Sequence, residues 1–133
     1  MAEFDFELVS PERQLVSGKA SEVVVPGSEG QFTVLENHAP FLSTLKAGIL
    51  DVTMAGGEKT RIFVRGGFAD ASPKGLTVLA EEAVPVSELK AETLAQSIRN
   101  AEEDVKDAKD DMERQAAAER LAELKEVQAA VFN

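Results

Sequence analysis

Glycine and proline stop abruptly part-way along this chain, and that break constrains the fold more than any other feature. All nine glycines lie at or before Gly75, and all five prolines lie at or before Pro85. The 48 residues that follow contain neither and are rich in Ala, Glu, Lys and Leu, which favour helices. We therefore predict two domains in the 133-residue chain, a turn-rich domain over 1–85 and a helical domain over 86–133.

The turn-rich part carries the period-two alternation of half-buried strands. In "FDFEL", Phe4, Phe6 and Leu8 alternate with Asp5 and Glu7. The alternation returns in three further runs. In the first, Leu50, Val52 and Met54 share a face. In the second, Ile62 and Val64 lie opposite Arg61, Phe63 and Arg65, and in the third, Leu76 and Val78 lie opposite Thr77 and Leu79. Turn signals separate the runs, at Ser10-Pro11, Gly18, Gly56-Gly57, Gly66-Gly67 and 72–75. Short strands without intervening helices predict an antiparallel β-sandwich or barrel.

The stretch Val23–Val25 is apolar on both faces of a strand. Such a strand either lies in the centre of the sheet or faces a partner as well as the core.

The helical part shows two apolar seams that are out of phase. The first seam recurs at three- and four-residue spacing through Ala91, Leu94, Ile98, Ala101, Val105, Ala108 and Met112, and the second runs through Ala117, Leu121, Leu124, Gln128 and Val131. The phase slips near Asp110–Gln115, where Asp110 is a candidate N-cap with Glu113 three residues later. This pattern favours an antiparallel two-helix hairpin, with a single kinked helix as the alternative.

Charge and composition exclude several classes of function. The formal net charge is −10, which disfavours nucleic-acid binding and adhesion to anionic lipid. The absence of Cys excludes disulfides, thiol nucleophiles and thiolate metal sites. No apolar run approaches the roughly 18 residues of a membrane span, and "MAEFDFELVS" does not resemble a signal peptide, so we expect no direct lipid insertion.

Residues that could carry chemistry are few. His38 is the chain's one histidine and lies in the turn "ENHAP", where packing or an interface is favoured over catalysis. A Ser-His-Asp arrangement with Ser28 or Ser43 is disfavoured because "G-x-S-x-G" is absent. "PGSEG" at 26–30 lacks the Lys of a phosphate loop and predicts a tight turn. The acids Asp107, Asp110 and Asp111 lack the spacing of a calcium loop, so we predict neither a metal site nor a catalytic residue.

Two long motifs resemble the epsilon subunit of F-type ATP synthases. "SGKASEVVVPGSEGQFTVLENHAPFLSTLKAG", at 17–48, is similar to the family's signature region, including its His-Ala-Pro. "RGGFADASPKGLTVLAEEA", at 65–83, is similar to the family's Gly-Gly-Phe and Thr-Val-Leu-Ala segments. The resemblance implies an N-terminal β-sandwich followed by a helical hairpin. It also implies a non-catalytic rotor subunit of the central stalk, peripheral at the cytoplasmic face of a bacterial inner membrane.

The resemblance further implies partners and their contact residues. The gamma subunit is expected to bind a face containing Ser10, His38, Ala39, Pro40, Phe41, Leu42 and Ser43. The ring of c subunits is expected to face the loop Gly27, Ser28, Glu29, Gly30 and Gln31, where Gln31 replaces the acid frequent in the family. The alpha/beta catalytic head is expected to meet the C-terminal helices, with Arg114 and Arg120 as the basic contacts and weak inhibition of ATP hydrolysis as the result.

Some family members bind ATP at the start of the first helix. Here Ser87 replaces the acid and Lys90 the arginine of that motif, so we predict weak or absent ATP binding, with Ser87 capping the helix. Two other classes of function remain as alternatives. A small β-sandwich enzyme is disfavoured by the missing catalytic groups, and a free-standing coiled-coil adaptor or chaperone is the stronger alternative.

Overall fold

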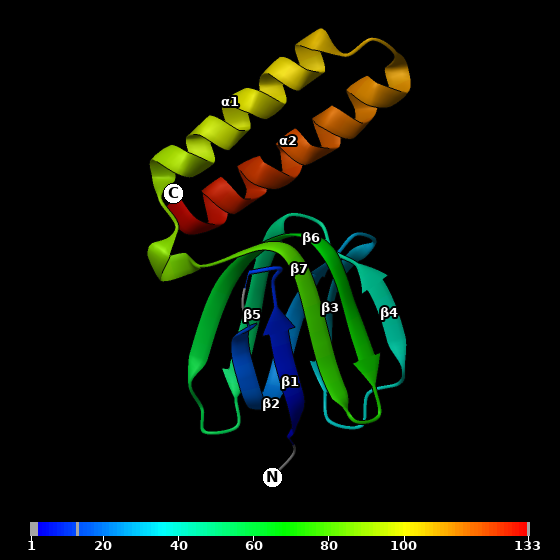
Figure 1. Cartoon of the computed structure of the whole chain (residues 1–133), viewed down its shortest axis with the longest axis vertical. Coiled ribbons are helices and arrows are strands. Elements are labelled where there is room, and N and C mark those ends of the chain that lie inside the picture. Colours follow the sequence, from blue (N-terminus) through cyan, green and yellow to red (C-terminus); the bar gives the residue numbers. More distant parts are fainter. Residues whose placement is uncertain (1–2, 13, 133) are drawn as a thin grey trace. The chain divides into compact units, whose positions relative to one another are not determined.

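The alternation of apolar and polar residues sets the strands of the N-terminal unit. The computed structural model describes residues 3–12 and 14–132, and the chain divides after Pro85 into two units that are each described by themselves. Within the described part, the first unit holds seven strands: β1 (Phe4–Val9), β2 (Gln14–Gly27), β3 (Gly30–Leu35), β4 (Phe41–Thr44), β5 (Gly48–Met54), β6 (Lys59–Ser72) and β7 (Gly75–Pro85) (Figure 1).

The strands pair in the order β1-β7-β6-β5-β2-β3, and β4 pairs with β6. Because β1 also pairs with β2, the strands β1, β7, β6, β5 and β2 form a closed ring. Every pair is antiparallel except β1–β7, which is parallel. The stretch Val23–Val25 pairs with both β3 and β5, so it lies centrally in the sheet.

The core fills the interior of this ring with alternate residues of each strand. Its most deeply buried large side chains are Phe6, Leu8, Val23, Val25, Leu50, Val52, Ile62, Val64, Leu76 and Val78. The sequence alternation places Phe63 on the outer face of the strand, opposite the core. Phe63 is nevertheless buried, although it does not belong to the core cluster. Its cross-strand neighbours on that face, Ile49 and Val84, are also apolar.

Two glycine signals do not mark turns. Gly18 lies inside β2, and Gly66-Gly67 lies inside β6, so the prediction of chain reversals at these positions is wrong. Gly66 and Gly67 have φ of 71° and 98°, values that bend a strand without ending it. The other predicted turns, at Ser10-Pro11, Gly56-Gly57 and 72–75, lie between strands.

The second unit is a short 3₁₀ helix η1 (Val86–Glu88) followed by α1 (Ala91–Asp107) and α2 (Asp111–Phe132), which pack against each other. The helices break at 108–110, and the Asp110 carboxylate accepts a hydrogen bond from the Glu113 N–H at 2.8 Å. Two expectations here are wrong. Met112 is 83% exposed, and Ser87 lies in η1 while the N-cap of α1 is Lys90, without a side-chain cap. No helix in the described part of the chain has the length and apolar character needed to cross a membrane.

Candidate interaction surface

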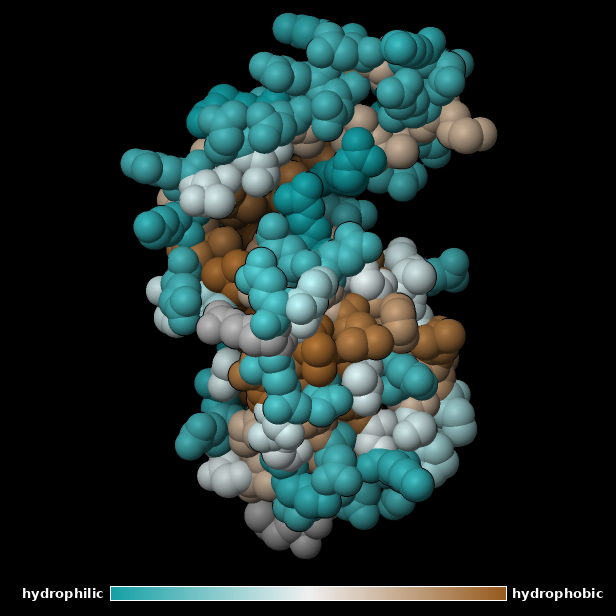
Figure 2. All heavy atoms as spheres, in the orientation of Figure 1, coloured by the Kyte–Doolittle hydropathy of each residue, from teal (hydrophilic) through white to brown (hydrophobic). Residues whose placement is uncertain are grey.

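One outward face of the β-sandwich carries a row of apolar side chains. Phe68 on β6 lies opposite Leu79 on β7, and Val9 on β1 lies opposite Leu79 on its other side. Phe68 and Leu79 are 39% and 37% exposed, and Leu42 on β4 is 67% exposed. We call Val9, Leu42, Phe68 and Leu79 the outer apolar patch, and Figure 2 shows hydrophobic residues gathered over this part of the sheet. An apolar patch on an exposed sheet face is typical of a surface that binds another protein.

The outer apolar patch brings together residues that lie far apart in the sequence, on four different strands. Ser10 lines a shallow hollow together with Val9, Phe68 and Leu79, and β4 adds Leu42 to the same patch. The structure therefore brings Ser10 and Leu42 to one face. Sequence reasoning missed Phe68 and Leu79 as part of that face. Leu79 follows buried Val78 on the same strand, so the alternation points it outward. A strand that faces solvent would carry a polar residue there, and this departure could have predicted the patch.

The β3–β4 turn holds His38 by packing and by a local hydrogen bond. Its Nδ1 lies 2.7 Å from the Leu35 carbonyl oxygen, and its ring meets the Phe4 ring edge-on at 5.6 Å. Nε2 is buried without a hydrogen-bond partner within the described residues. The next two residues, Ala39 and Pro40, are exposed. This geometry orders the turn and leaves its tip available for contact.

The predicted gamma-facing residues do not form one tight cluster. His38 packs on Phe4 at the start of β1, whereas Ser10 follows the end of β1, about 20 Å away at 3.3 Å per residue. Phe41 lies opposite buried Ala71, with its ring 5.0 Å from the Phe32 ring, so it is on the other face of β4 from Leu42. The Ser43 hydroxyl donates to the Thr44 carbonyl at 2.9 Å. A surface of this length matches a standard protein interface better than a small-molecule site.

The predicted ring-facing loop is the tight turn between β2 and β3. Gly27 pairs with Gly30, which leaves Ser28 and Glu29 as its two exposed tip residues. The Ser28 N–H donates to the Thr44 carbonyl at 2.9 Å, and the Ser28 and Thr44 hydroxyls lie 2.5 Å apart. These bonds fix the turn, while the side chains of Glu29 and Gln31 remain exposed.

The helical candidates are exposed and belong to surface ion pairs or to the inter-unit connection. Arg114 lies 2.9 Å from the Asp111 carboxylate, and Arg120 lies 3.9 Å from Asp104 on α1. Ser87 and Lys90 are both exposed in the segment that leads into α1. Each arginine already has an acidic neighbour within the hairpin.

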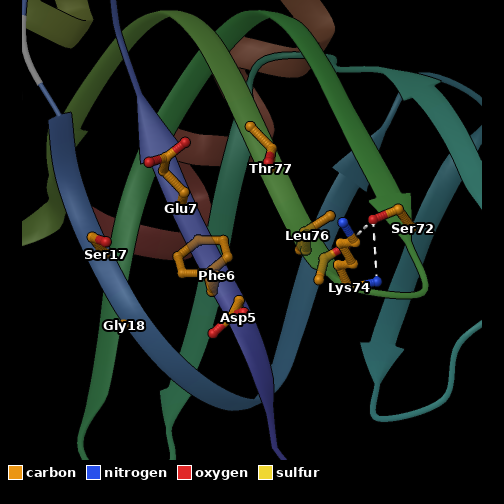
Figure 3. Close-up of a pocket in the computed structure, with 10 residues that line it drawn as sticks. Asp5, Phe6, Glu7, Ser17, Gly18, Ser72, Lys74, Leu76 and Thr77 are labelled. Atoms are coloured by element: carbon orange, nitrogen blue, oxygen red, sulfur yellow. Dashed lines mark hydrogen bonds between the residues drawn. The ribbon is translucent and has the colours of Figure 1, made fainter.

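Candidate metal ligands do not cluster within the described residues. No group of three or more His, Cys, Asp or Glu in this part of the chain could hold a metal ion. Figure 3 shows an open hollow beside β1 and β7, where Asp5, Glu7 and Lys74 are strand and turn surface residues. Asp5 is paired with Lys19 at 2.6 Å, and this hydrogen bond and the Asp5 charge raise the pKa of Lys19 above its ordinary value.

Comparison with known proteins identifies the family. Residues 3–86 match the family described as "ATP synthase, Delta/Epsilon chain, beta-sandwich domain". An ATP synthase epsilon chain from Parvibaculum lavamentivorans is 52% identical over 132 residues, covering 98% of this chain and 100% of the relative. The chain belongs to the ATP synthase delta/epsilon family. This epsilon-family chain is also 49% identical to an ATP synthase epsilon chain from Maricaulis maris, over 93% of its own length and 92% of the relative.

Solved structures share the fold of this epsilon-family chain. A chain in the cryo-EM structure of Euglena gracilis mitochondrial ATP synthase, with OSCP, F1 and c-ring, has a TM-score of 0.79 and 26% identity, covering 98% of this chain and 82% of that chain. A chain in the central stalk and c-ring structure of Tetrahymena thermophila mitochondrial ATP synthase has a TM-score of 0.75 and 13% identity, covering 96% of each chain, which shows the fold alone. The predicted β-sandwich followed by two helices is confirmed.

Proposed function

We propose that this epsilon-family chain is a non-catalytic rotor subunit in the central stalk of an ATP synthase. In this role it binds the gamma subunit and the ring of c subunits and carries torque between proton flow and ATP synthesis. The observation that supports the proposal most is an outward apolar patch on the β-sandwich of a chain 52% identical to an ATP synthase epsilon chain along its length. The family match also favours this role over a free-standing adaptor.

The gamma-binding face in this proposal is centred on the outer apolar patch. Leu42, Phe68 and Leu79 expose enough apolar surface to form the desolvated centre of an interface. Ser10 lies at one margin of the patch. The turn residues His38, Ala39 and Pro40, with Phe41 and Ser43 on the opposite face of β4 from Leu42, form a second proposed gamma contact beside the patch.

The ring-facing surface is the Gly27–Gly30 turn together with Gln31. Its two-residue tip is held by backbone and hydroxyl bonds to Thr44, so its exposed polar groups lose little conformational entropy on binding. Polar loops of the c ring are the proposed partner. The subunit is thereby peripheral, at the cytoplasmic face of a bacterial inner membrane, and contributes to ion transport only as part of the complex.

The helical hairpin is proposed as a weak regulator of ATP hydrolysis. Arg114 and Arg120 are the residues available to an acidic loop of the catalytic head, but both have acidic neighbours in the hairpin. Nucleotide binding at Ser87 and Lys90 is proposed to be weak or absent. Ser87 lacks the carboxylate of the family's motif, and Lys90 lacks the planar fork of arginine.

The gamma assignment is tested by the Leu79→Ser variant. Leu79 points outward with 37% of its surface exposed, so the change leaves the core intact but removes apolar contact area. We expect the affinity for a gamma-containing complex depleted of this subunit to fall by about 1–2 kcal/mol, roughly 5–30-fold in Kd. Binding is measured by surface plasmon resonance, with one-to-one co-purification as a second readout.

Met112→Ser is the matched control, because Met112 is an 83% exposed apolar residue on α2 outside the patch. It should bind like the parent chain. Unchanged affinity in a normally folded Leu79→Ser variant would show that gamma does not bind this face.

A further inference from the structure

Acidic side chains flank the outer apolar patch on both sides. Asp70 on β6 lies between Leu42 on β4 and Thr77 on β7 in the cross-strand register. Glu81 follows Leu79 by two residues on β7, and its carboxylate lies over Gly66, where a Cβ would come within 2.6 Å of Oε2. Both Asp70 and Glu81 are exposed. The apolar row therefore has a carboxylate on each of its long sides.

These two carboxylates have no counter-charge within residues 3–12 and 14–132. Ion pairs among the described residues include Lys19 with Asp5, Arg61 with Asp51, Arg114 with Asp111 and Arg120 with Asp104, and none of these four involves Asp70 or Glu81. The cross-strand neighbours of Asp70 are the uncharged Leu42 and Thr77. Glu81 lies over a glycine, which offers it no side chain. Both carboxylates are thus exposed and not ion-paired with any described residue.

Covering the apolar row brings a partner's surface against these carboxylates. If the partner presents acids or apolar groups there, two charges lose water without compensation, which opposes binding. If it presents Lys or Arg, the charges pair at the rim of the interface and also attract the partner during the approach. The net charge of −10 on the whole chain strengthens the long-range part of that attraction at low salt.

We infer that Asp70 and Glu81 form an acidic clamp around the outer apolar patch, which selects a partner surface with an apolar ridge flanked by Lys or Arg. This inference rests on the proposed function, since gamma is the partner proposed for this face. In this account the two carboxylates increase the association rate, and the apolar patch lowers the dissociation rate. Rim charges act mainly on the association rate and its salt dependence, whereas buried apolar contacts act mainly on the dissociation rate.

The test measures association of the full-length chain with a gamma-containing complex depleted of this subunit, at about 50 and 300 mM salt. The variants are Asp70→Asn, Glu81→Gln and their combination. We expect the double variant to associate about 5–10-fold more slowly at low salt and to lose most of its salt dependence, with a dissociation rate within about twofold of the parent. Glu58→Gln is the matched control, since Glu58 is exposed in the β5–β6 turn, and it should associate like the parent.

The outcomes separate this inference from the gamma assignment. If Leu79→Ser dissociates faster while the double variant associates at the parental rate, the acidic clamp is wrong and the gamma-binding face stands. If neither Leu79→Ser nor the double variant changes binding, the face itself is wrong. An increase in association on removal of the two charges would also overturn the clamp, because it would mean that the partner's surface is acidic there. Unfolding curves of all variants establish that they are folded.

Discussion

Gly67 lies at a point of β6 that has no space for a side chain. A Cβ built on it would lie 1.8 Å from the Leu79 carbonyl oxygen, and its φ of 98° is one that L-residues rarely adopt. The Gly67 carbonyl also accepts a hydrogen bond from the Leu45 N–H at 3.0 Å. The backbone conformation of Gly67 therefore sets the course of β6 and, with it, the position of Phe68 in the outer apolar patch.

We predict that Gly67→Ala destabilises the β-sandwich by about 2–4 kcal/mol, because strain at positive φ and a clash with rigid backbone act together. Two other glycines separate these causes. Gly56→Ala meets open space without a positive φ and should change stability by less than about 0.5 kcal/mol. Gly57 has a φ of 95° and open space, so Gly57→Ala should show the cost of the backbone strain alone. Urea unfolding midpoints measure all three, and equal values for Gly67→Ala and Gly57→Ala would contradict the clash.

The same glycines explain why Phe68 was missed from the sequence. Ile62 and Val64 are buried at even positions of β6, whereas Ala69 and Ala71 are buried at odd positions, so the alternation changes phase at Gly66-Gly67. If Gly66-Gly67 is interpreted as a turn, the alternation before the pair does not predict which residues after it face outward. The outward position of Phe68 depends on a backbone conformation that residue identity permits but does not specify.

The start of α2 is defined by a reciprocal set of cap bonds. The Asp110 carboxylate accepts from the Glu113 N–H at 2.8 Å, and the Glu113 carboxylate accepts from the Lys109 N–H at 3.0 Å. The Arg114 N–H donates to the Asp110 carbonyl at 3.0 Å, which is the first turn of the helix. Without Gly or Pro in this region, the cap is the local feature that ends one helix and begins the next.

We predict that Asp110→Ala destabilises the hairpin by about 1 kcal/mol, because it removes the side-chain acceptor of the Glu113 N–H. Asp110→Asn should retain most of the stability, since its side-chain oxygen still accepts. Ser87→Ala is the control and should have no measurable effect, because Ser87 lies in η1 and does not cap α1. Thermal unfolding followed by circular dichroism at 222 nm measures the change. A Ser87→Ala loss equal to that of Asp110→Ala would refute this account.

The element boundaries show what periodicity can and cannot predict. The slip between the two apolar seams predicted a break near Asp110, and the structure ends α1 at Asp107 and begins α2 at Asp111. Met112 was assigned to the first seam by extending its spacing, but the break comes before it and the new helix starts in its own phase. Buried Val127 was missed because the second seam was drawn through Gln128. Periodicity holds within an element and fails across its end.

At the scale of the whole molecule, the proposed gamma and ring contacts belong to one unit and the proposed regulatory contacts to the other. Residues 1–85 hold the outer apolar patch, the β3–β4 turn and the Gly27–Gly30 turn, while 86–133 holds the two arginines. The α2 segment carries five acids and three bases, a net charge of −2. An acidic target in the catalytic head would be repelled by this helix overall.

Truncation after Pro85 tests this division of roles. We predict that the truncated chain still binds gamma and supports proton-coupled ATP synthesis at close to the full-length level, because its proposed contact surfaces are retained. We expect ATP hydrolysis by the complex to rise less than twofold, since Arg114 and Arg120 are neutralised locally by Asp111 and Asp104 and the hairpin buries its apolar seams on itself. The full-length Arg114→Ala/Arg120→Ala variant is the control and should show an equally small rise. ATPase assays and ATP synthesis in reconstituted vesicles measure both effects.

A several-fold rise on truncation that the double variant reproduces would mean that the two arginines act as a brake despite their acidic neighbours. A several-fold rise on truncation alone would mean that the apolar faces of the helices, and not their charges, hold back hydrolysis.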